Sequence, residues 1–511
     1  MRRFYVQNFG CRATQADGAV IERQFVDQGL RPAVHSAEAD IVVINSCTVT
    51  GEADRDARAA IRRIRRDNPK CQIVVTGCYA QRAPQEVAAL PEVSRVIGNS
   101  HKHELAKILQ RAFVPLSSLQ TENQDFRTKN REPGTENHVF VSDIFAHTEL
   151  LAAPVFEAAG ESNETARTRP NLKVQDGCGN RCSFCIIPSV RGHSRSLPLA
   201  EVIREVNALV DAGYHEVVIS GINLGRWGCD LRHSTGNEPR GDSRPRLSGR
   251  AQISRDSGIV PPFTASATQV LASTHARSYR FEDLIRAILD QTSLEKLRIS
   301  SVEPMDWSDQ LISLMAESPR IAKHAHVPMQ SASDAVLRRM HRRYRPWHYR
   351  EKIEKIRAAM PTAAIGADVM VGFPGETDAE FEETRRTIEH LTFTYLHVFT
   401  YSARPGTPAA VMPNQVPLHV ARERNRILRD LAAQKKLAFM RSFIGRTIRA
   451  ITLNGRVSTA PSFPVEHSST FTSALTDNYL KLQLHGIHEP NRWITVNITS
   501  VDGDALTGFA G

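Results

Sequence analysis

Three cysteines in one short loop are the residues of this chain best suited to chemistry. Cys178, Cys182 and Cys185 have the spacing CxxxCxxC within the segment CGNRCSFC. Thiolates this close together can hold three irons of a cubic iron–sulfur cluster and leave one iron open to a small molecule. A structural zinc site usually takes four ligands from paired knuckles, and no fourth Cys or His stands at that spacing here. The spacing therefore favours a cluster with one open coordination position.

A second group of cysteines follows segments that are expected to form strands. Cys11, Cys47 and Cys78 come shortly after strand-like runs at residues 4–9, 40–45 and 72–76. Because parallel α/β sheets gather their sites outside the carboxyl ends of their strands, these three thiols can converge in space. The alternative is three unrelated buried thiols, since free cysteine is often buried. Cys71, which precedes its strand, and the isolated Cys229 are interpreted as bystanders.

The elements around both groups predict an α/β protein with three folded parts. Residues 1–112 read as an α/β unit. Strand-like runs at residues 172–175, 216–220, 296–299, 365–370 and 395–400 alternate with helical stretches, which predicts a partial (β/α) barrel. A long amphipathic helix is expected at about Leu418–Met440. Short alternating runs after residue 444 predict a small all-β barrel.

Composition shifts suggest where these parts begin and end. We expect an N-terminal domain at residues 1–113, a linker with a polar insertion at 114–165, a core at 166–440 and a β domain at 441–511. The polar stretch 115–137 and the Ser/Arg/Pro/Gly-rich stretch 233–278 lack periodicity, and we interpret both as disordered insertions.

Polar loops after the predicted barrel strands are placed to meet a cofactor. These loops contribute Gly221, Asn223, Ser301, Glu303 and Gln330; turn formation and helix capping are the alternative roles for such residues. The segment with His324 and His326 could suggest a metal site. We interpret it as a polar barrel loop, because no further ligands stand nearby in the sequence. The basic run Arg338–Arg345 is either an RNA contact or a solvated face.

Composition narrows the class of protein and its setting. The 511 residues contain 65 Lys+Arg against 55 Asp+Glu, a net charge of +10 that favours a polyanionic partner. Eight cysteines in a chain of this length do not indicate a disulfide framework. The N-terminus lacks the apolar core of a signal peptide, and no apolar run is long enough to span a bilayer. We therefore expect a cytoplasmic protein without a membrane partner.

With these motifs in place, the chain resembles the radical SAM (S-adenosylmethionine) methylthiotransferases. The array CGNRCSFC, with an aromatic residue before its last cysteine, resembles the radical SAM signature. The strings that look most like the MtaB-type enzymes of this family are INSCTVTGEADRDARAAIRR, VVTGCYAQ, LKVQDGC, IIPSVRGHSRSLP, SSVEPMD, ADVMVGFPGET and ALTDNYLKL. The resemblance covers nearly the whole chain except the two insertions. Gly179 stands where close relatives would have Asn, and no ligand is lost by that departure.

The resemblance implies a two-cluster enzyme that uses SAM. Cys178, Cys182 and Cys185 would hold the 4Fe-4S cluster that binds and cleaves SAM, and Cys11, Cys47 and Cys78 a second 4Fe-4S cluster that carries the sulfur. Such an enzyme adds a methylthio group at carbon 2 of threonylcarbamoyladenosine, next to the anticodon in the tRNA stem-loop. A flavodoxin or ferredoxin would supply electrons, and the C-terminal part would be a TRAM domain that helps to hold tRNA.

Three other functions remain open. Isopentenyladenosine in tRNA is the nearest alternative substrate, and an aspartate of a ribosomal protein is another target within the same family. A non-catalytic iron–sulfur module is the remote alternative, and it leaves the open coordination positions unexplained. Since the threonylcarbamoyl group carries a carboxylate, a cationic pocket near the site would support the first assignment.

Overall fold

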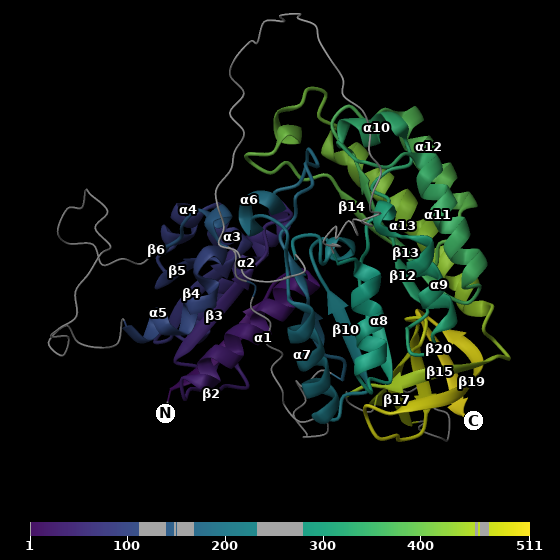
Figure 1. The fold of residues 1–511 in the computed structure, drawn as a ribbon. Coiled ribbons are helices and arrows are strands. Elements are labelled where there is room, and N and C mark those ends of the chain that lie inside the picture. The colour runs from purple at the N-terminus through teal and green to yellow at the C-terminus, as the bar shows by residue number, and fades with distance from the viewer. Residues whose placement is uncertain are drawn as a thin grey trace, which may run out of the picture.

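The computed structural model describes residues 2–111, 139–147, 150, 168–231, 279–454, 458–459 and 470–511. The insertions expected at 115–137 and 233–278 lie outside the described residues. Figure 1 shows the three folded parts, with the N-terminal domain beside the core and the C-terminal barrel beneath the core.

The N-terminal domain is a parallel sheet with helices on both faces. Its strand order is β2 (Arg31–Pro32), β1 (Arg3–Asn8), β3 (Ile41–Ser46), β4 (Gln72–Gly77), β5 (Arg95–Gly98) and β6 (Val139–Phe140). Its helices are α1 (Arg12–Asp27), α2 (Gly51–Asp67), α3 (Cys78–Arg82), α4 (Pro84–Ala88) and α5 (Leu105–Arg111). The apolar runs of β3 and β4 are buried on both faces, as a central parallel strand requires. The predicted α/β unit is confirmed.

One strand of this sheet comes from the range that was expected to be a linker. Val139 and Phe140 pair in parallel with Val96 and Ile97 of β5 and extend the sheet by one edge strand. The sequence favours a short strand at Val139–Phe145, but so few residues carry too little pattern to show which sheet they join.

The core is an open barrel of six parallel strands. They run in the order β7 (Asn171–Lys173), β10 (Glu216–Ser220), β11 (Lys296–Ile299), β12 (His324–His326), β13 (Ala364–Val371) and β14 (Tyr395–Thr400). Bridges from Leu297 to Ile321 and from Ser301 to His326 join the two halves. The outer helices are α7 (Leu199–Asp211), α8 (Phe281–Gln291), α9 (Asp309–Glu317), α10 (Asp334–Arg339), α11 (Pro346–Ala359), α12 (Asp378–His390) and α13 (Leu418–Arg441). The predicted partial barrel is confirmed, although His324–His326 is a strand and not the loop that we expected.

The C-terminal part is a closed β-barrel. It contains β15 (Thr447–Thr452), β17 (Thr470–Thr476), β18 (Lys481–His485), β19 (Trp493–Asp502) and β20 (Ala505–Ala510), with the short β16 (Ser458–Thr459) beside β17. Pairing of β15 with β17 closes the barrel, and its interior is the apolar cluster that includes Leu482, Leu484 and Val496. The expected small β domain is confirmed. No helix among the described residues has the length and apolar character needed to cross a bilayer.

Candidate metal centres and cofactor site

The three N-terminal cysteines share one edge of the first sheet. Cys11 is the N-cap residue of α1, Cys47 follows β3 and Cys78 is the first residue of α3. Gly10 shows how close two of these loops are, because a Cβ on Gly10 would lie 2.5 Å from the Cys47 Cβ. Gly10 has φ +104°, which other residues rarely adopt. The fold therefore brings together the three thiols that the strand pattern placed at carboxyl ends.

The surroundings of these thiols suit a bound metal cluster. Burial and, to a smaller extent, the neighbouring Cys78 together raise the pKa of Cys47 to about 12. The Asn99 Nδ2 donates to the Cys78 Sγ at 3.6 Å. A bound metal ion takes the place of the thiol proton. The buried thiolate then does not carry an uncompensated negative charge. Three thiols without a fourth cysteine beside them fit a cluster with one open iron, since Cys71 lies at the opposite end of β4.

The second cysteine group lies on the loop after β7 and the short β8 (Gln175–Asp176). Arg342 Nη1 lies 3.2 Å from the Cys182 Sγ, and the Asn223 Nδ2 lies 3.7 Å from the Cys178 Sγ. Burial raises the pKa of Cys185 to about 12. Donors aimed at the sulfurs are what a thiolate-ligated cluster needs, because they offset its negative charge. The donor set of this loop fits the cluster that the spacing predicts.

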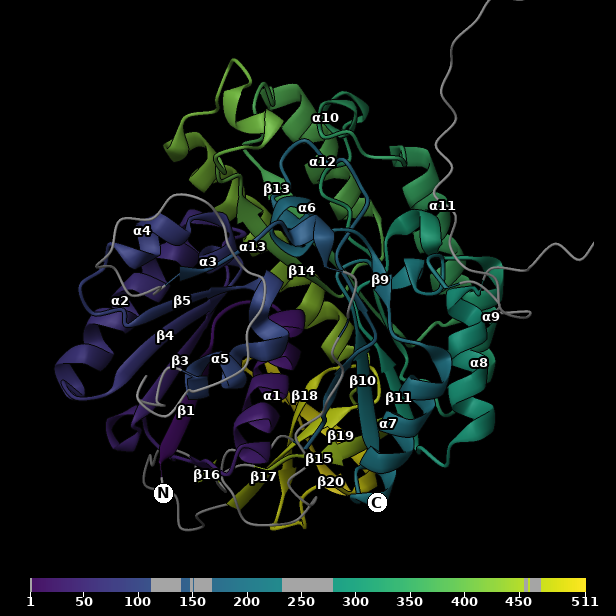
Figure 2. The same ribbon diagram turned by 60° about the vertical axis from the view of Figure 1, so that its left-hand side comes forward.

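The two cysteine groups are neighbours across the interface between the domains. Helix α6 (Ile187–Arg191) begins two residues after Cys185, and Ile186 and Val190 form a buried apolar cluster with Cys78. Asn99 spans the same junction, since its Nδ2 also donates to the Val190 carbonyl at 2.8 Å. Figure 2 shows α6 against the N-terminal domain. Any two clusters held here would be fixed relative to each other by packed elements.

Three of the five predicted cofactor residues lie beside the second cysteine group. The Asn223 N–H donates to the Gln175 Oε1 at 2.7 Å, and Gly221 packs against the same Gln175 side chain. Glu303 forms an ion pair with Arg342, which in turn contacts Cys182. These contacts link the loops after β10 and β11 to the cysteine loop. These contacts do not test whether each residue binds SAM, which stays a prediction.

The other two predicted residues lie around β12. The Ser301 Oγ is 3.0 Å from the His326 Nδ1, and Gln330 adopts φ 61° with its N–H bonded to the Asp368 carbonyl. The Gln330 Oε1 and the Asn223 Oδ1 are buried and have no hydrogen-bond partner among the described residues. Buried acceptors are usually paired, so these two oxygens point to a polar ligand with donors. The amino group of SAM fits that requirement.

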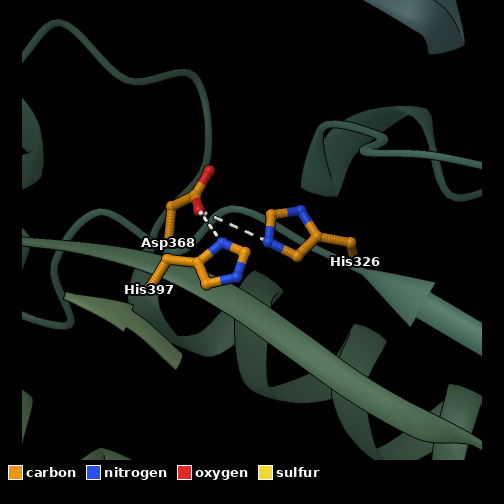
Figure 3. Close-up of side chains that lie close together, drawn as sticks. All are labelled: His326, Asp368 and His397. Atoms are coloured by element: carbon orange, nitrogen blue, oxygen red, sulfur yellow. Dashed lines mark hydrogen bonds and ion pairs between the residues drawn. The ribbon is translucent and has the colours of Figure 1, made fainter. Parts of the chain in front are cut away.

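A third cluster joins His326 to two residues that are distant in the sequence. Asp368 Oδ1 lies 3.3 Å from the His326 Nε2 and 3.3 Å from the His397 Nδ1, as Figure 3 shows. The interpretation that His326 lacks further ligands nearby was wrong, because the parallel strands β12, β13 and β14 bring the three side chains to one face. The three residues have the geometry of a candidate single-ion site. A hydrogen bond between His397 and Asp368 and an ion pair of His326 with the same carboxylate also account for the contacts without an ion.

Basic and aromatic groups gather at the amino-terminal end of the barrel strands. Tyr479, at the tip of the β17–β18 hairpin, accepts a hydrogen bond from Arg12 Nη2 at 2.8 Å and lies under Arg298 at 5.1 Å. Arg169 lies 5.9 Å from the same ring. Glu216 pairs with Arg298 at 2.6 Å and Arg169 at 3.5 Å. Three guanidinium groups thus surround the tyrosine ring, and two of them, those of Arg169 and Arg298, pair with the Glu216 carboxylate.

Most of the basic run Arg338–Arg345 forms ion pairs within the protein. Arg338 and Arg345 pair with Asp334, Arg339 pairs with Glu380, and Arg342 pairs with Glu303. His341 and Arg343 are the exposed basic members for which no ion pair is found within the described residues. The run therefore offers far less free charge to RNA than its composition suggested.

Several of these residues do not stand out in the sequence. His397 was not singled out, and Asp368 and Arg342 were noted only within longer motifs. Tyr395 and His397 at alternating positions of β14, and the lone Asp368 in the apolar β13, were the available signals, because alternation places side chains on one face. Which face would line the barrel depended on the packing of Leu396 and Val398 against the helical side of the core.

Family models match the two larger parts of the chain. The model described as "Uncharacterized protein family UPF0004" matches residues 3–98, and the model described as "Radical SAM superfamily" matches residues 172–388. These ranges contain Cys11, Cys47 and Cys78 in the first match and Cys178, Cys182 and Cys185 in the second. Each match therefore includes one of the two cysteine groups.

Curated relatives align along almost the whole chain. "Threonylcarbamoyladenosine tRNA methylthiotransferase MtaB" of Aquifex aeolicus is 30% identical, covering 96% of this chain and 99% of its own. The protein of that name from Bacillus subtilis is 32% identical, covering 94% of this chain and 90% of its own. "tRNA-2-methylthio-N(6)-dimethylallyladenosine synthase 1" of Mycobacterium marinum is also 32% identical, covering 89% of this chain and 76% of its own. Identity alone does not separate the two kinds of relative.

Proposed function

The chain belongs to the family of radical SAM tRNA methylthiotransferases, and we propose that it converts threonylcarbamoyladenosine next to the tRNA anticodon to its 2-methylthio form. Cys178, Cys182 and Cys185 would hold the 4Fe-4S cluster that supplies the electron for SAM cleavage. Cys11, Cys47 and Cys78 would hold a second 4Fe-4S cluster that supplies sulfur. The adenine carbon–hydrogen bond has no acidic proton, so radical chemistry is the physical reason for these cofactors.

Within the proposed site, the protein's own side chains bind and orient SAM. Asn223 and Gln330 offer buried acceptor oxygens that have no partner in the described part of the chain. Gly221 leaves room beside Gln175, Glu303 is placed by Arg342, and Ser301 is placed by His326. We assign all five residues to the SAM site. Their proximity to the Cys178 loop or to β12 supports the assignment.

The polar inner face of β12, β13 and β14 is the observation that carries the choice of substrate. His326, Asp368 and His397 line it, and the guanidinium groups of Arg12, Arg169 and Arg298 lie at its base. A threonylcarbamoyl group brings ureido N–H donors and a carboxylate, which such groups can bind. An isopentenyl group is a hydrocarbon and would leave these polar groups desolvated and unpaired.

The remaining alternatives differ in what they would need. An enzyme that modifies a ribosomal-protein aspartate would not need to bind an anticodon loop. The net charge of +10, however, favours a nucleic acid as partner. A non-catalytic iron–sulfur module leaves the buried, unpaired oxygens of Asn223 and Gln330 without a purpose. We propose tRNA as the macromolecular partner, a flavodoxin or ferredoxin as the reductant, and the cytoplasm as the location.

Mass spectrometry of tRNA nucleosides tests the proposal directly. Cells that lack their own enzyme would be examined with and without this gene. We expect 2-methylthio-threonylcarbamoyladenosine to appear only with the gene. The isopentenyl product would overturn the substrate and keep the reaction class. No change in either nucleoside, with both clusters loaded, would shift the assignment to the ribosomal-protein target.

A single substitution on the inner face tests the choice of substrate. His397→Phe replaces a polar ring whose side chain is 64% exposed with an apolar one. We expect kcat/KM for the threonylcarbamoyl substrate to fall at least about tenfold, because one hydrogen bond to a polar substrate group is lost. Uncoupled SAM cleavage should remain. His390→Phe on the outer helix α12 is the matched control, and equal activity of the two variants would contradict the proposed role.

A further inference from the structure

A small cavity between the N-terminal domain and the core belongs to neither cysteine group. It has a volume of about 50 Å³ and lies between α1, the residues just before α5, and α6. One water-sized particle needs roughly 10–15 Å³ by the same measure. The cavity therefore has room for a few atoms, such as a small inorganic ion, and none for a nucleoside.

The wall of this cavity carries more basic than acidic side chains. Its acidic members are Asp17 and Asp176, its lysines and arginines are Lys102, Lys173, Arg191 and Arg195, and His103 and His147 also line it. Lys102 and Arg191 Nη2 each lie 3.0 Å from an Asp17 oxygen, and Lys173 also pairs with Asp17. Asp176 binds Arg191 at 3.0 Å and Lys173 at 2.8 Å.

The ion pairs around Asp17 favour its ionised form in spite of its burial. Burial raises the pKa of Asp17, but Lys102, Lys173 and Arg191 together hold it well below its ordinary range. Burial, with Arg191 nearby, lowers the pKa of Lys102. Three buried basic groups, Lys102, Lys173 and Arg191, thus face two buried carboxylates, and half-buried Arg195 adds a fourth positive charge. Uncompensated buried charge is costly.

Donors at the wall also remain without partners. Arg191 is 2% exposed, and its Nε has no hydrogen-bond partner among the described residues. The Arg195 Nε is in the same state, although its two terminal nitrogens bond to the carbonyls of His147 and Arg191. Unused donors beside excess positive charge are the features of an anion site.

The cavity also adjoins the N-terminal cysteine group. Asn99 lines it and donates to the Cys78 Sγ at 3.6 Å. We propose that this cavity binds a small monovalent anion, hydrosulfide in the working enzyme, beside the cysteines that would hold the second cluster. This inference rests on the proposed function, which consumes one reduced sulfur atom for each modified base. It concerns binding alone.

Bromide is a suitable probe, because it is a monovalent anion of similar size and scatters X-rays anomalously. Crystals of the cluster-loaded protein would be soaked in a concentration series of sodium bromide at constant ionic strength. We expect an anomalous peak in the cavity that added hydrosulfide displaces. Arg195→Gln should weaken bromide binding about tenfold, since it removes one charge-assisted hydrogen bond.

Arg204→Gln is the matched control, because Arg204 is exposed on α7 and pairs with Glu205. It should bind bromide like the parent protein. Iron content and thermal midpoint would verify that both variants are folded and loaded. Arg195 is only half-buried and forms no ion pair with Asp17 or Asp176 within the described residues, so its replacement leaves the buried pairs intact.

Four outcomes would overturn the inference. They are the absence of bromide from the cavity, undiminished binding in Arg195→Gln, binding only after the clusters are removed, and failure of hydrosulfide to displace bromide. The third would show that the cluster itself is the counter-ion, and the fourth that the site takes halide only. None of these readouts uses tRNA. Anion binding without any methylthio product would therefore contradict the proposed function and not the site.

Discussion

At the scale of single residues, burial sets the state of the thiols. It raises the pKa of Cys47 and of Cys185 to about 12, so each is a neutral thiol until a metal takes its proton. Arg342 near Cys182 and Asn99 near Cys78 supply hydrogen-bond donors to the resulting thiolates. The two groups thus have similar chemistry but different partners, and they should be separable by substitution.

Cysteine substitutions test whether one cluster serves SAM cleavage and the other serves sulfur insertion. Cys11→Ala or Cys47→Ala should abolish sulfur insertion and leave SAM cleavage measurable, because the loop after β7 is untouched. Cys182→Ala should abolish both activities. The measurements are 5′-deoxyadenosine formation and nucleoside analysis. Exposed Cys229 offers a neutral control as Cys229→Ala. Equal loss of SAM cleavage in all three folded variants would count against two separable clusters.

At the scale of elements, alternation along short parallel strands builds the inner wall of the barrel. His324 and His326 of β12, Asp368 of β13, and Tyr395 and His397 of β14 share one face. The opposite face of β14 packs Leu396 and Val398 toward the helices. Barrel interiors are commonly filled with branched apolar residues, so this polar wall indicates a binding surface.

His324 should make the stability of this wall depend on pH. Burial lowers the pKa of His324 well below its ordinary value, with Arg298 adding to the effect. Below pH 6.5 the unfolded chain therefore binds a proton that the folded chain does not. Folding stability should then fall by about 1.4 kcal/mol per pH unit as the pH decreases.

Denaturant unfolding between pH 7 and pH 5 measures this dependence. His324→Gln can retain a hydrogen bond to the Tyr395 hydroxyl, which lies 2.7 Å from the His324 Nε2, but it cannot take up a proton. Its profile should be flatter than that of the parent protein by the stated slope. His390→Gln on the outer surface should reproduce the parent profile. Identical slopes in all three proteins would refute a neutral, buried His324.

At the scale of the whole molecule, buried polar contacts hold the three parts together. Tyr479 of the C-terminal barrel contacts Arg12 of the N-terminal domain and Arg298 of the core. Asp17 of the N-terminal domain pairs with Lys173 and Arg191 of the core. These contacts fix the orientation of the parts, and with it the relative position of the two cysteine groups.

Asp17→Asn should therefore destabilise the assembly of the domains. It would leave Lys102, Lys173 and Arg191 with one buried carboxylate, and breaking such a network typically costs about 3–5 kcal/mol. Asp27→Asn removes an exposed pair with Arg23, 2.9 Å long, and should cost less than about 1 kcal/mol. Chemical denaturation would compare the two variants. Similar stabilities would show that the Asp17 network does not hold the interface.

The sequence by itself determined the placement of the cysteines and the order of the parts. Thiol spacing at Cys178–Cys185 is local, and the strand–cysteine order at Cys11, Cys47 and Cys78 needs only the rule that parallel strands place their carboxyl ends together. Apolar runs such as Ile41–Ile44 predict strands, because a strand buried on both faces is apolar throughout.

Only the tertiary structure decided what surrounds those cysteines. Asp368 and His397 meet His326 because strands that are distant in sequence are neighbours in the barrel. The basic run Arg338–Arg345 is largely paired, and the strand Val139–Phe140 joins the N-terminal sheet, because partners for both come from other segments. Charge, pairing and burial are properties of neighbours in space, and periodicity along the chain records only neighbours in sequence.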